Sequence, residues 1–107
     1  MSKRVLVVDD DDSIRETFQY HLERAGYHVA AAATAEEALG LLPEVEPGVV
    51  ITDIRMPGMD GLELLGRIQK ASRDTDVLVI TEHEDMRSAS AAMKRGAYDY
   101  LVKPLDL

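Results

Sequence analysis

The sequence predicts an α/β domain built on a parallel, five-stranded sheet. Short apolar runs rich in Val and Ile alternate with amphipathic helical patterns along the whole chain, and this alternation is typical of successive strand–helix–strand units. The apolar runs are continuous, as expected of parallel strands that are buried on both faces. A length of 107 residues fits a single domain over residues 1–107.

Five of the apolar runs are expected to be strands. They cover residues 5–8, 27–31, 49–52, 77–80 and 98–102. The second run is weaker than the others, so we expect it at an edge of the sheet. Joined by helices, these strands predict a flavodoxin-like, doubly wound sheet with the strand order 2-1-3-4-5.

Two helices are expected in the first half of the chain. The first has Ser13 as its N-cap and ends at Gly26. The second begins with a capping box at residues 34–37 and ends before Pro43. The side chains predicted to face the sheet are Ile14, Phe18, Leu22 and Ala25 in the first helix and Ala38, Leu41 and Leu42 in the second.

Two further helices are expected in the second half. One is capped by Asp60, and the other runs over about residues 85–95 and ends at Gly96. The inward-facing side chains are expected to be Leu62, Leu65 and Ile68 in the third helix and Met86, Ala89 and Met93 in the fourth. No fifth helix follows the last strand, although a parallel sheet needs helices on both faces. We therefore expect the sequence to be a fragment that ends before its last helix, or a partner to cover the bare face.

The composition excludes several classes of function. The net charge of −8 argues against direct binding of nucleic acid by this domain. The absence of Cys rules out disulfides, thiol chemistry and Cys-zinc sites, and the three His residues are too scattered for a metal motif. No apolar run is long enough for a signal sequence or a membrane span, so a cytoplasmic location is expected.

Charged side chains directly follow three of the predicted strands. Asp9 and Asp10 follow the first strand, Asp53 follows the third and Lys103 follows the fifth. Because the carboxyl ends of parallel strands open into one crevice, we expect these side chains to lie close together. Three carboxylates in one place repel one another unless a cation joins them. Mg²⁺, which prefers oxygen ligands, is the simplest such cation, and beside a lysine ammonium it would suit a phosphoryl group.

The acidic residues also have simpler interpretations when each is taken alone. Asp9 and Asp10 could belong to a solvated loop that favours the next helix's N-terminus, which is the interpretation retained for Asp11 and Asp12. Asp53 could be an ordinary turn aspartate. At a strand end facing the crevice, however, its carboxylate could act as a nucleophile toward phosphorus.

Two neutral side chains near the predicted crevice are ambiguous in the same way. Thr81 ends the fourth strand, where a β-branched strand residue or a helix cap is the commoner role. In the crevice its hydroxyl could instead donate to a phosphoryl oxygen. Tyr100, taken alone, is more typical of half-buried strand packing than of a switch.

Three stretches of the sequence resemble a known family. VLVVDDDDSIRE, VVITDIRMPGMDGLELL and GAYDYLVKPLD are similar to the receiver domain of two-component response regulators. The resemblance covers the whole chain, with the motifs in the right order at the predicted strand ends. The residues around Asp53 and after Gly96 are most similar to receivers of nitrogen-regulation-class transcriptional activators.

The resemblance implies roles for particular residues. Asp53 would accept the phosphoryl group from the phosphohistidine of a sensor histidine kinase, and Lys103 would contact the phosphate. Asp10 and Asp53 would bind Mg²⁺ directly, and Asp9 through water. The other implied features are the Arg55 backbone carbonyl as a metal ligand, Thr81 and Tyr100 as a switch pair, and a cis Lys103-Pro104 bond.

The resemblance therefore implies a regulatory domain rather than an enzyme with a separate substrate. Such a domain takes part in its own phosphotransfer and dephosphorylation. It switches an output domain or a downstream protein, here of a transcriptional regulator, and can do so as a dimer.

Glu82 departs from the family pattern, because the residue after the switch threonine is usually small. A long anionic side chain there could block the phosphoryl group and repel it. Within about 6 Å of Asp53 it would also raise the pKa of that carboxyl. It could equally point into solvent and change nothing.

Three other functions remain as alternatives. An Mg²⁺-dependent phosphohydrolase with an aspartyl nucleophile usually has an acid/base carboxylate two residues later, but Arg55 stands there. A flavodoxin-like nucleotide or flavin binder needs a glycine-rich first loop, but residues 9–13 are acidic and lack glycine. A receiver-like interaction scaffold that no longer uses phosphate is favoured only by Glu82.

Overall fold

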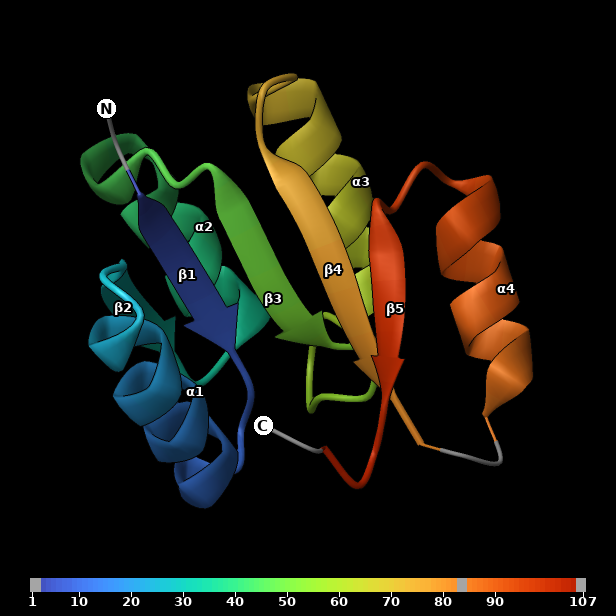
Figure 1. Cartoon of the computed structure of the whole chain (residues 1–107). Coiled ribbons are helices and arrows are strands. Elements are labelled where there is room, and N and C mark those ends of the chain that lie inside the picture. The colour runs from blue at the N-terminus through green and yellow to red at the C-terminus, as the bar shows by residue number, and fades with distance from the viewer. Residues whose placement is uncertain (1–2, 83–84, 106–107) are drawn as a thin grey trace.

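Five parallel strands form one sheet in the order β2-β1-β3-β4-β5, as the sequence predicts (Figure 1). The computed structural model describes residues 3–82 and 85–105. The strands are β1 (Arg4–Val8), β2 (His28–Ala32), β3 (Val49–Asp53), β4 (Asp76–Thr81) and β5 (Asp99–Val102). The helices are α1 (Asp12–Arg24), α2 (Ala35–Val45), α3 (Gly61–Ala71) and α4 (Met86–Lys94). None of the helices in this described part is long and apolar enough to cross a membrane.

The strand register aligns the carboxyl ends of the four strands that carry the candidate site. Val8 pairs with Thr52 between β1 and β3, and Asp53 pairs with Ile80 between β3 and β4. Thr81 is in register with Val102 between β4 and β5. The residues that follow these strands therefore begin at one edge of the sheet.

Helices cover the two faces of the sheet unequally. One face carries α2, α3 and α4, and the other carries α1 (Figure 1). The larger core lies on the three-helix face and includes fully buried Leu6, Val79, Leu64 and Ile68. The smaller core joins Phe18 of α1 to inner side chains of the sheet.

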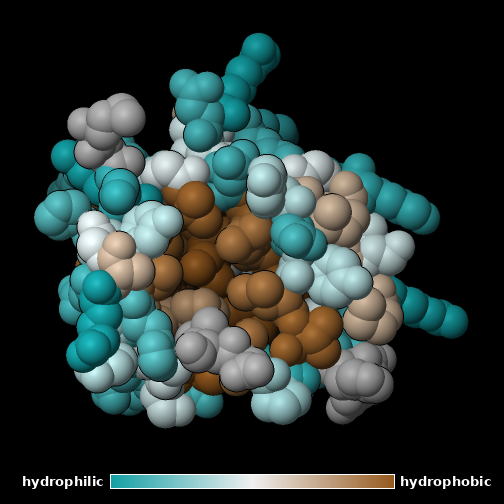
Figure 2. Space-filling view, in the orientation of Figure 1, coloured by the Kyte–Doolittle hydropathy of each residue, from teal (hydrophilic) through white to brown (hydrophobic). Residues whose placement is uncertain are grey.

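An apolar surface remains on the α1 side of the sheet (Figure 2). Its partly buried members are Val49, Leu78, Leu101 and Leu105. Within residues 3–82 and 85–105, β5 is the last regular element. The expectation that the sequence is a fragment of a longer chain stays a prediction.

Two helix ends differ from the prediction. The N-cap of α1 is Asp11 rather than Ser13, because the Asp11 carboxylate accepts the backbone N–H and the hydroxyl of Ser13, each at 2.9 Å. The predicted end of α2 before Pro43 is wrong, since the helix continues to Val45 and ends at left-handed Glu46. A proline in a last turn removes one hydrogen bond, and continued helical bonds to Glu46 outweigh that loss here.

The inward face of α4 also differs from the prediction. Ala89 and Ala92 are buried, whereas Met86 and Met93 are 43% and 39% exposed. Small side chains at this spacing let the helix lie on β4 and β5 with its methionines outside. Two other predictions about the backbone are confirmed. Gly26 and Gly96 follow the ends of helices α1 and α4 with positive φ, and the Lys103-Pro104 peptide bond is cis.

Gly61 fixes how closely α3 approaches the end of β3. It is the first residue of α3, and its N–H donates to the Ile54 carbonyl at 2.8 Å. A Cβ atom there would overlap the Asp53 carbonyl oxygen and lie 2.7 Å from the Ile54 Cα. Both obstacles are backbone atoms, so a larger side chain would displace the segment that carries Asp53.

We predict that Gly61→Ala lowers the free energy of unfolding by about 1–3 kcal/mol through overpacking. Gly40→Ala is the matched control, because Gly40 lies inside α2 and an added methyl group there would meet no atom within 4 Å. That variant should gain about 0.5–1 kcal/mol from the better helix propensity of alanine. Urea unfolding followed by circular dichroism measures both changes. Equal effects of the two variants would contradict this account of Gly61.

Candidate functional site at the carboxyl edge of the sheet

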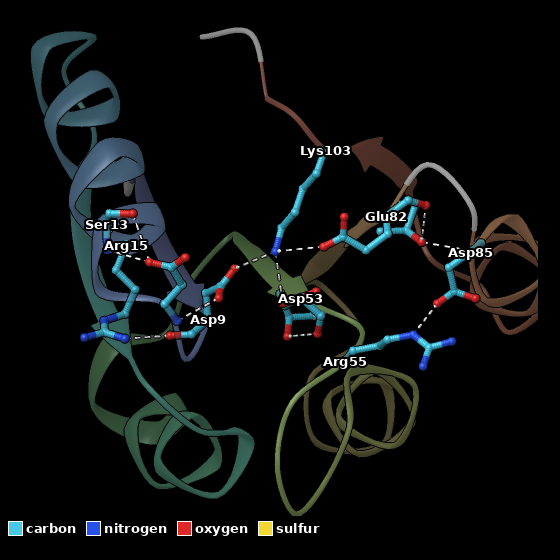
Figure 3. A network of polar contacts seen from close by, with 11 residues as sticks. Asp9, Ser13, Arg15, Asp53, Arg55, Glu82, Asp85 and Lys103 are labelled. Atoms are coloured by element: carbon cyan, nitrogen blue, oxygen red, sulfur yellow. Dashed lines mark hydrogen bonds and ion pairs between the residues drawn. The ribbon is translucent and has the colours of Figure 1, made fainter.

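Two loops and one strand end bring the candidate residues together. Asp9 and Asp10 lie between β1 and α1, Asp53 is the last residue of β3, and Lys103 directly follows β5. Figure 3 shows the Lys103 side chain reaching across the edge of the sheet toward Asp9 and Asp53. The sequence-based expectation that these side chains converge is confirmed.

The three aspartates form one cluster of oxygen atoms. One carboxylate oxygen from each of Asp9, Asp10 and Asp53 lies within 4.8 Å of the other two. Asp9 is fully buried, Asp53 is buried and Asp10 is exposed, so the cluster opens to solvent on one side. The three carboxylates lie at the carboxyl edge of the sheet, where like charges so close together are costly without a cation.

Burial raises the pKa of two of these carboxyls. The pKa of Asp9 rises to about 6, mainly because burial disfavours the charged form, although a hydrogen bond from Asp11 opposes the shift. Burial also raises the pKa of Asp53, and the neighbouring Lys103 ammonium opposes that shift. Both carboxyls are therefore harder to ionise than an exposed aspartate.

Lys103 contacts three carboxylates at once. Its Nζ donates to Asp53 Oδ2 at 3.3 Å and lies 3.8 Å from Asp9 Oδ2. The third contact is Glu82 Oε1, at 3.7 Å. Burial lowers the pKa of Lys103, but the attraction of Asp53 and Asp9 exceeds that effect, so the pKa is raised on balance. The ammonium therefore stays charged in the physiological range.

The aspartates fit a hard divalent cation. Asp9 Oδ2 is buried and has no hydrogen-bond partner among residues 3–82 and 85–105, while Oδ1 accepts the Asp11 N–H at 2.9 Å. An unpartnered buried carboxylate oxygen costs free energy unless a charge is bound to it. All the donors are carboxylate oxygens, which Mg²⁺ prefers over nitrogen or sulfur ligands. The assignment of the Arg55 carbonyl as a further ligand stays a prediction.

Thr81 is buried beside the cluster, but its hydroxyl is bonded within the loop that follows β4. It donates to the Asp85 carbonyl at 3.0 Å and is 3.3 Å from the Glu82 carbonyl. Tyr100 is partly buried and packs against the core on the three-helix face of the sheet. The structure therefore shows the packing role that the residue type alone suggests for Tyr100.

An ion pair that sequence reasoning missed joins two loops at the site. Arg55 Nε donates to Asp85 Oδ2 at 2.8 Å, across 30 positions of sequence. The hydrogen bond from Arg55 lowers the pKa of Asp85. Asp85 is the N-cap residue of α4, so this pair connects the loop after β3 to the start of α4. Nothing in the local sequence around either residue indicates the pairing.

The Glu82 side chain reaches toward the site, although half of it stays exposed to solvent. Its Oε1 atom contacts Lys103, and its side chain remains 51% exposed. Figure 3 shows the Lys103 ammonium between Asp9 on one side and Glu82 on the other. The neighbour on which Glu82 acts directly is thus Lys103.

Known regulators resemble this chain over nearly its whole length. The regulator DctD of Rhizobium meliloti, a C4-dicarboxylate transport transcriptional regulatory protein, is 44% identical over 100 residues, which are 94% of this chain and 22% of that protein. The DNA-binding transcriptional regulator NtrC of Salmonella typhimurium is 43% identical over 103 residues, or 96% of this chain and 22% of that protein. The chain thus spans about a fifth of the length of these relatives.

Solved structures match the fold closely. A response regulator receiver domain protein from Clostridium thermocellum superposes with a TM-score of 0.91 at 35% identity, covering 99% of this chain and 85% of that one. The beryllofluoride-activated NtrC4 receiver domain dimer gives a TM-score of 0.89 at 41% identity, covering 97% of this chain and 86% of that one. The family model of the response regulator receiver domain matches residues 5–107. The chain therefore belongs to the response regulator receiver domain family.

Proposed function

We propose that Asp53 accepts a phosphoryl group from a sensor histidine kinase, with Mg²⁺ bound by the neighbouring aspartates. The observation that supports this most is that Asp53 belongs to the acidic cluster and lies 3.3 Å from the Lys103 ammonium. An acidic cluster supplies the metal ligands and an ammonium supplies a fixed positive charge. Together they suit a phosphoryl group that carries negative charge on its equatorial oxygens.

The transfer makes one bond and breaks one bond. An Asp53 oxygen attacks the phosphorus of the kinase phosphohistidine, forming an acyl phosphate as the P–N bond breaks. The imidazole keeps the bonding electrons and takes up a proton. Lys103, 3.3 Å from Asp53 Oδ2, faces the charge that the phosphoryl group brings. A bound Mg²⁺, held by Asp10 and Asp53 and by Asp9 through water, would supply charge neutralisation at the same place.

The same site would return the domain to its starting state. Attack of water on the phosphorus breaks the P–O bond, restores the Asp53 carboxylate and releases inorganic phosphate. We therefore assign the domain a regulatory role with self-dephosphorylation. The position of Arg55 supports this over a phosphohydrolase, because the residue two positions after Asp53 is a cation paired with Asp85.

The phosphorylated state would be passed on through Thr81, Tyr100 and the surface around α4. Thr81 would give up its bond to the Asp85 carbonyl for a phosphoryl oxygen, which would release the start of α4. The relatives are transcriptional regulators a little over four times as long as this chain, and the NtrC4 receiver is a dimer when activated. These relatives support an attached output domain and dimerisation on activation.

We predict that acetyl phosphate with Mg²⁺ phosphorylates the domain at Asp53. Mass spectrometry should show the gain of one phosphoryl group in the wild type. The gain should be absent in Asp53→Asn, which lacks the nucleophilic carboxylate, and should disappear when EDTA removes the metal. A phosphorylated Asp53→Asn variant would place the acceptor elsewhere, and an unmodified wild type would contradict the proposed function.

We predict that millimolar Mg²⁺ raises the melting temperature of the domain at constant ionic strength, because binding to the native state adds to its stability. Asp10→Asn removes a ligand from the exposed side of the cluster and should reduce this rise markedly. Asp74→Asn makes the same charge change at an exposed position at the other end of β4 and should leave the rise unchanged. An Mg²⁺-independent melting temperature would count against the metal site.

We predict that Asp9→Asn stabilises the metal-free domain in a pH-dependent way. A folded-state pKa of about 6 against 3.8 means that ionised Asp9 disfavours the folded state, and this cost grows as pH rises from 3.8 to about 6. The gain should be roughly 3 kcal/mol at about pH 7.5 and roughly 1 kcal/mol at about pH 4.5, less the cost of burying the amide. Urea unfolding in EDTA at the two pH values measures it. A gain that is larger at the lower pH would show that charge burial is not the cause.

A further inference from the structure

We propose that Glu82 is an internal competitor of the phosphoryl group for Lys103, and that it slows phosphorylation of Asp53 through its charge. The inference rests on the proposed function of Asp53 and concerns the rate of that reaction. It assigns a negative regulatory role to a side chain outside the cluster of three aspartates. The step that it affects is the formation of the acyl phosphate.

The geometry supplies the competition. Lys103 offers three N–H donors, and three carboxylates surround its ammonium at 3.3 Å, 3.7 Å and 3.8 Å. Asp53 and Asp9 approach from β3 and β1, and Glu82 approaches from the end of β4 (Figure 3). A phosphoryl group on Asp53 needs part of the same donor set. The Glu82 carboxylate already forms an ion pair with one side of the ammonium, at 3.7 Å.

Charge adds to the competition for donors. The incoming donor and the product acyl phosphate are both anions, so a carboxylate on the far side of Lys103 opposes them while it stays in place. Half of the Glu82 side chain is exposed, so it can also turn into solvent at little cost. The Glu82–Lys103 ion pair therefore slows phosphorylation of Asp53 without preventing it. Half-exposed ion pairs of this kind change equilibria by roughly two- to fivefold.

Two substitutions separate charge from bulk. Glu82→Gln keeps the length of the side chain and removes the charge, and Glu82→Ala removes both. With acetyl phosphate and saturating Mg²⁺, Glu82→Gln should raise the phosphorylation rate roughly two- to fivefold and recover most of the gain of Glu82→Ala. The gain should fall toward none as salt rises from about 0.1 M to about 1 M, because salt screens an exposed pair.

Glu44→Gln is the matched control. Glu44 is an exposed glutamate near the end of α2, at the opposite end of the domain from the site, and loses the same charge. Its rate should equal that of the wild type. A gain in this variant as large as that of Glu82→Gln would assign the effect to net charge and overturn the proposal.

A binding measurement tests the inference without turnover. Beryllofluoride, an analogue of a phosphoryl group on a carboxylate, should bind Glu82→Gln roughly two- to fivefold more tightly than the wild type in a ¹⁹F NMR titration. Equal affinities, equal rates, or a gain confined to Glu82→Ala would each overturn the proposal. Failure of the proposed function looks different, because the wild type and all variants would then remain unphosphorylated at Asp53.

Discussion

The contact of one lysine ammonium with several carboxylates is the interaction on which the candidate site depends. Asp9, Asp53 and Glu82 come from three different strand ends, and each lies within 4 Å of Lys103 Nζ. Three carboxylates gathered around one point would repel one another in the absence of a cation. The parallel register makes the contact possible, because it aligns the ends of β1, β3, β4 and β5 at one edge. The sheet therefore determines the site, and the ammonium makes its charge tolerable.

The part of the site that lies on strand ends could be predicted from the sequence. Apolar, β-branched runs mark the strands, the order of a doubly wound sheet brings their carboxyl ends together, and the next residue of each run is then fixed in space. Asp9, Asp53 and Lys103 obey this rule. The helix ends were less predictable, since Asp11 and Ser13 are both good N-caps and a proline in a last turn costs only one hydrogen bond.

The contacts made by long side chains in loops could not be predicted in this way. Arg55 and Asp85 are 30 positions apart, and neither belongs to a periodic pattern that would fix its direction. Glu82 had two reasonable orientations, toward the site or into solvent, and several rotatable bonds with which to reach either. The choice depends on the position of Lys103, which only the assembled sheet supplies.

The loop after β4 connects these separate contacts into one unit. Glu82 pairs with Lys103 after β5, Asp85 pairs with Arg55 after β3, and the buried Thr81 hydroxyl donates to the Asp85 carbonyl between them. Under the proposed function, a phosphoryl group on Asp53 would offer both Lys103 and Thr81 a new acceptor. The Lys103–Glu82 ion pair and the Thr81 hydrogen bond to Asp85 would weaken in exchange. The free energy of those two contacts would then enter the equilibrium between the unphosphorylated and the phosphorylated domain. Because Asp85 is the N-cap residue of α4, the start of α4 is the first regular element that such an exchange would disturb.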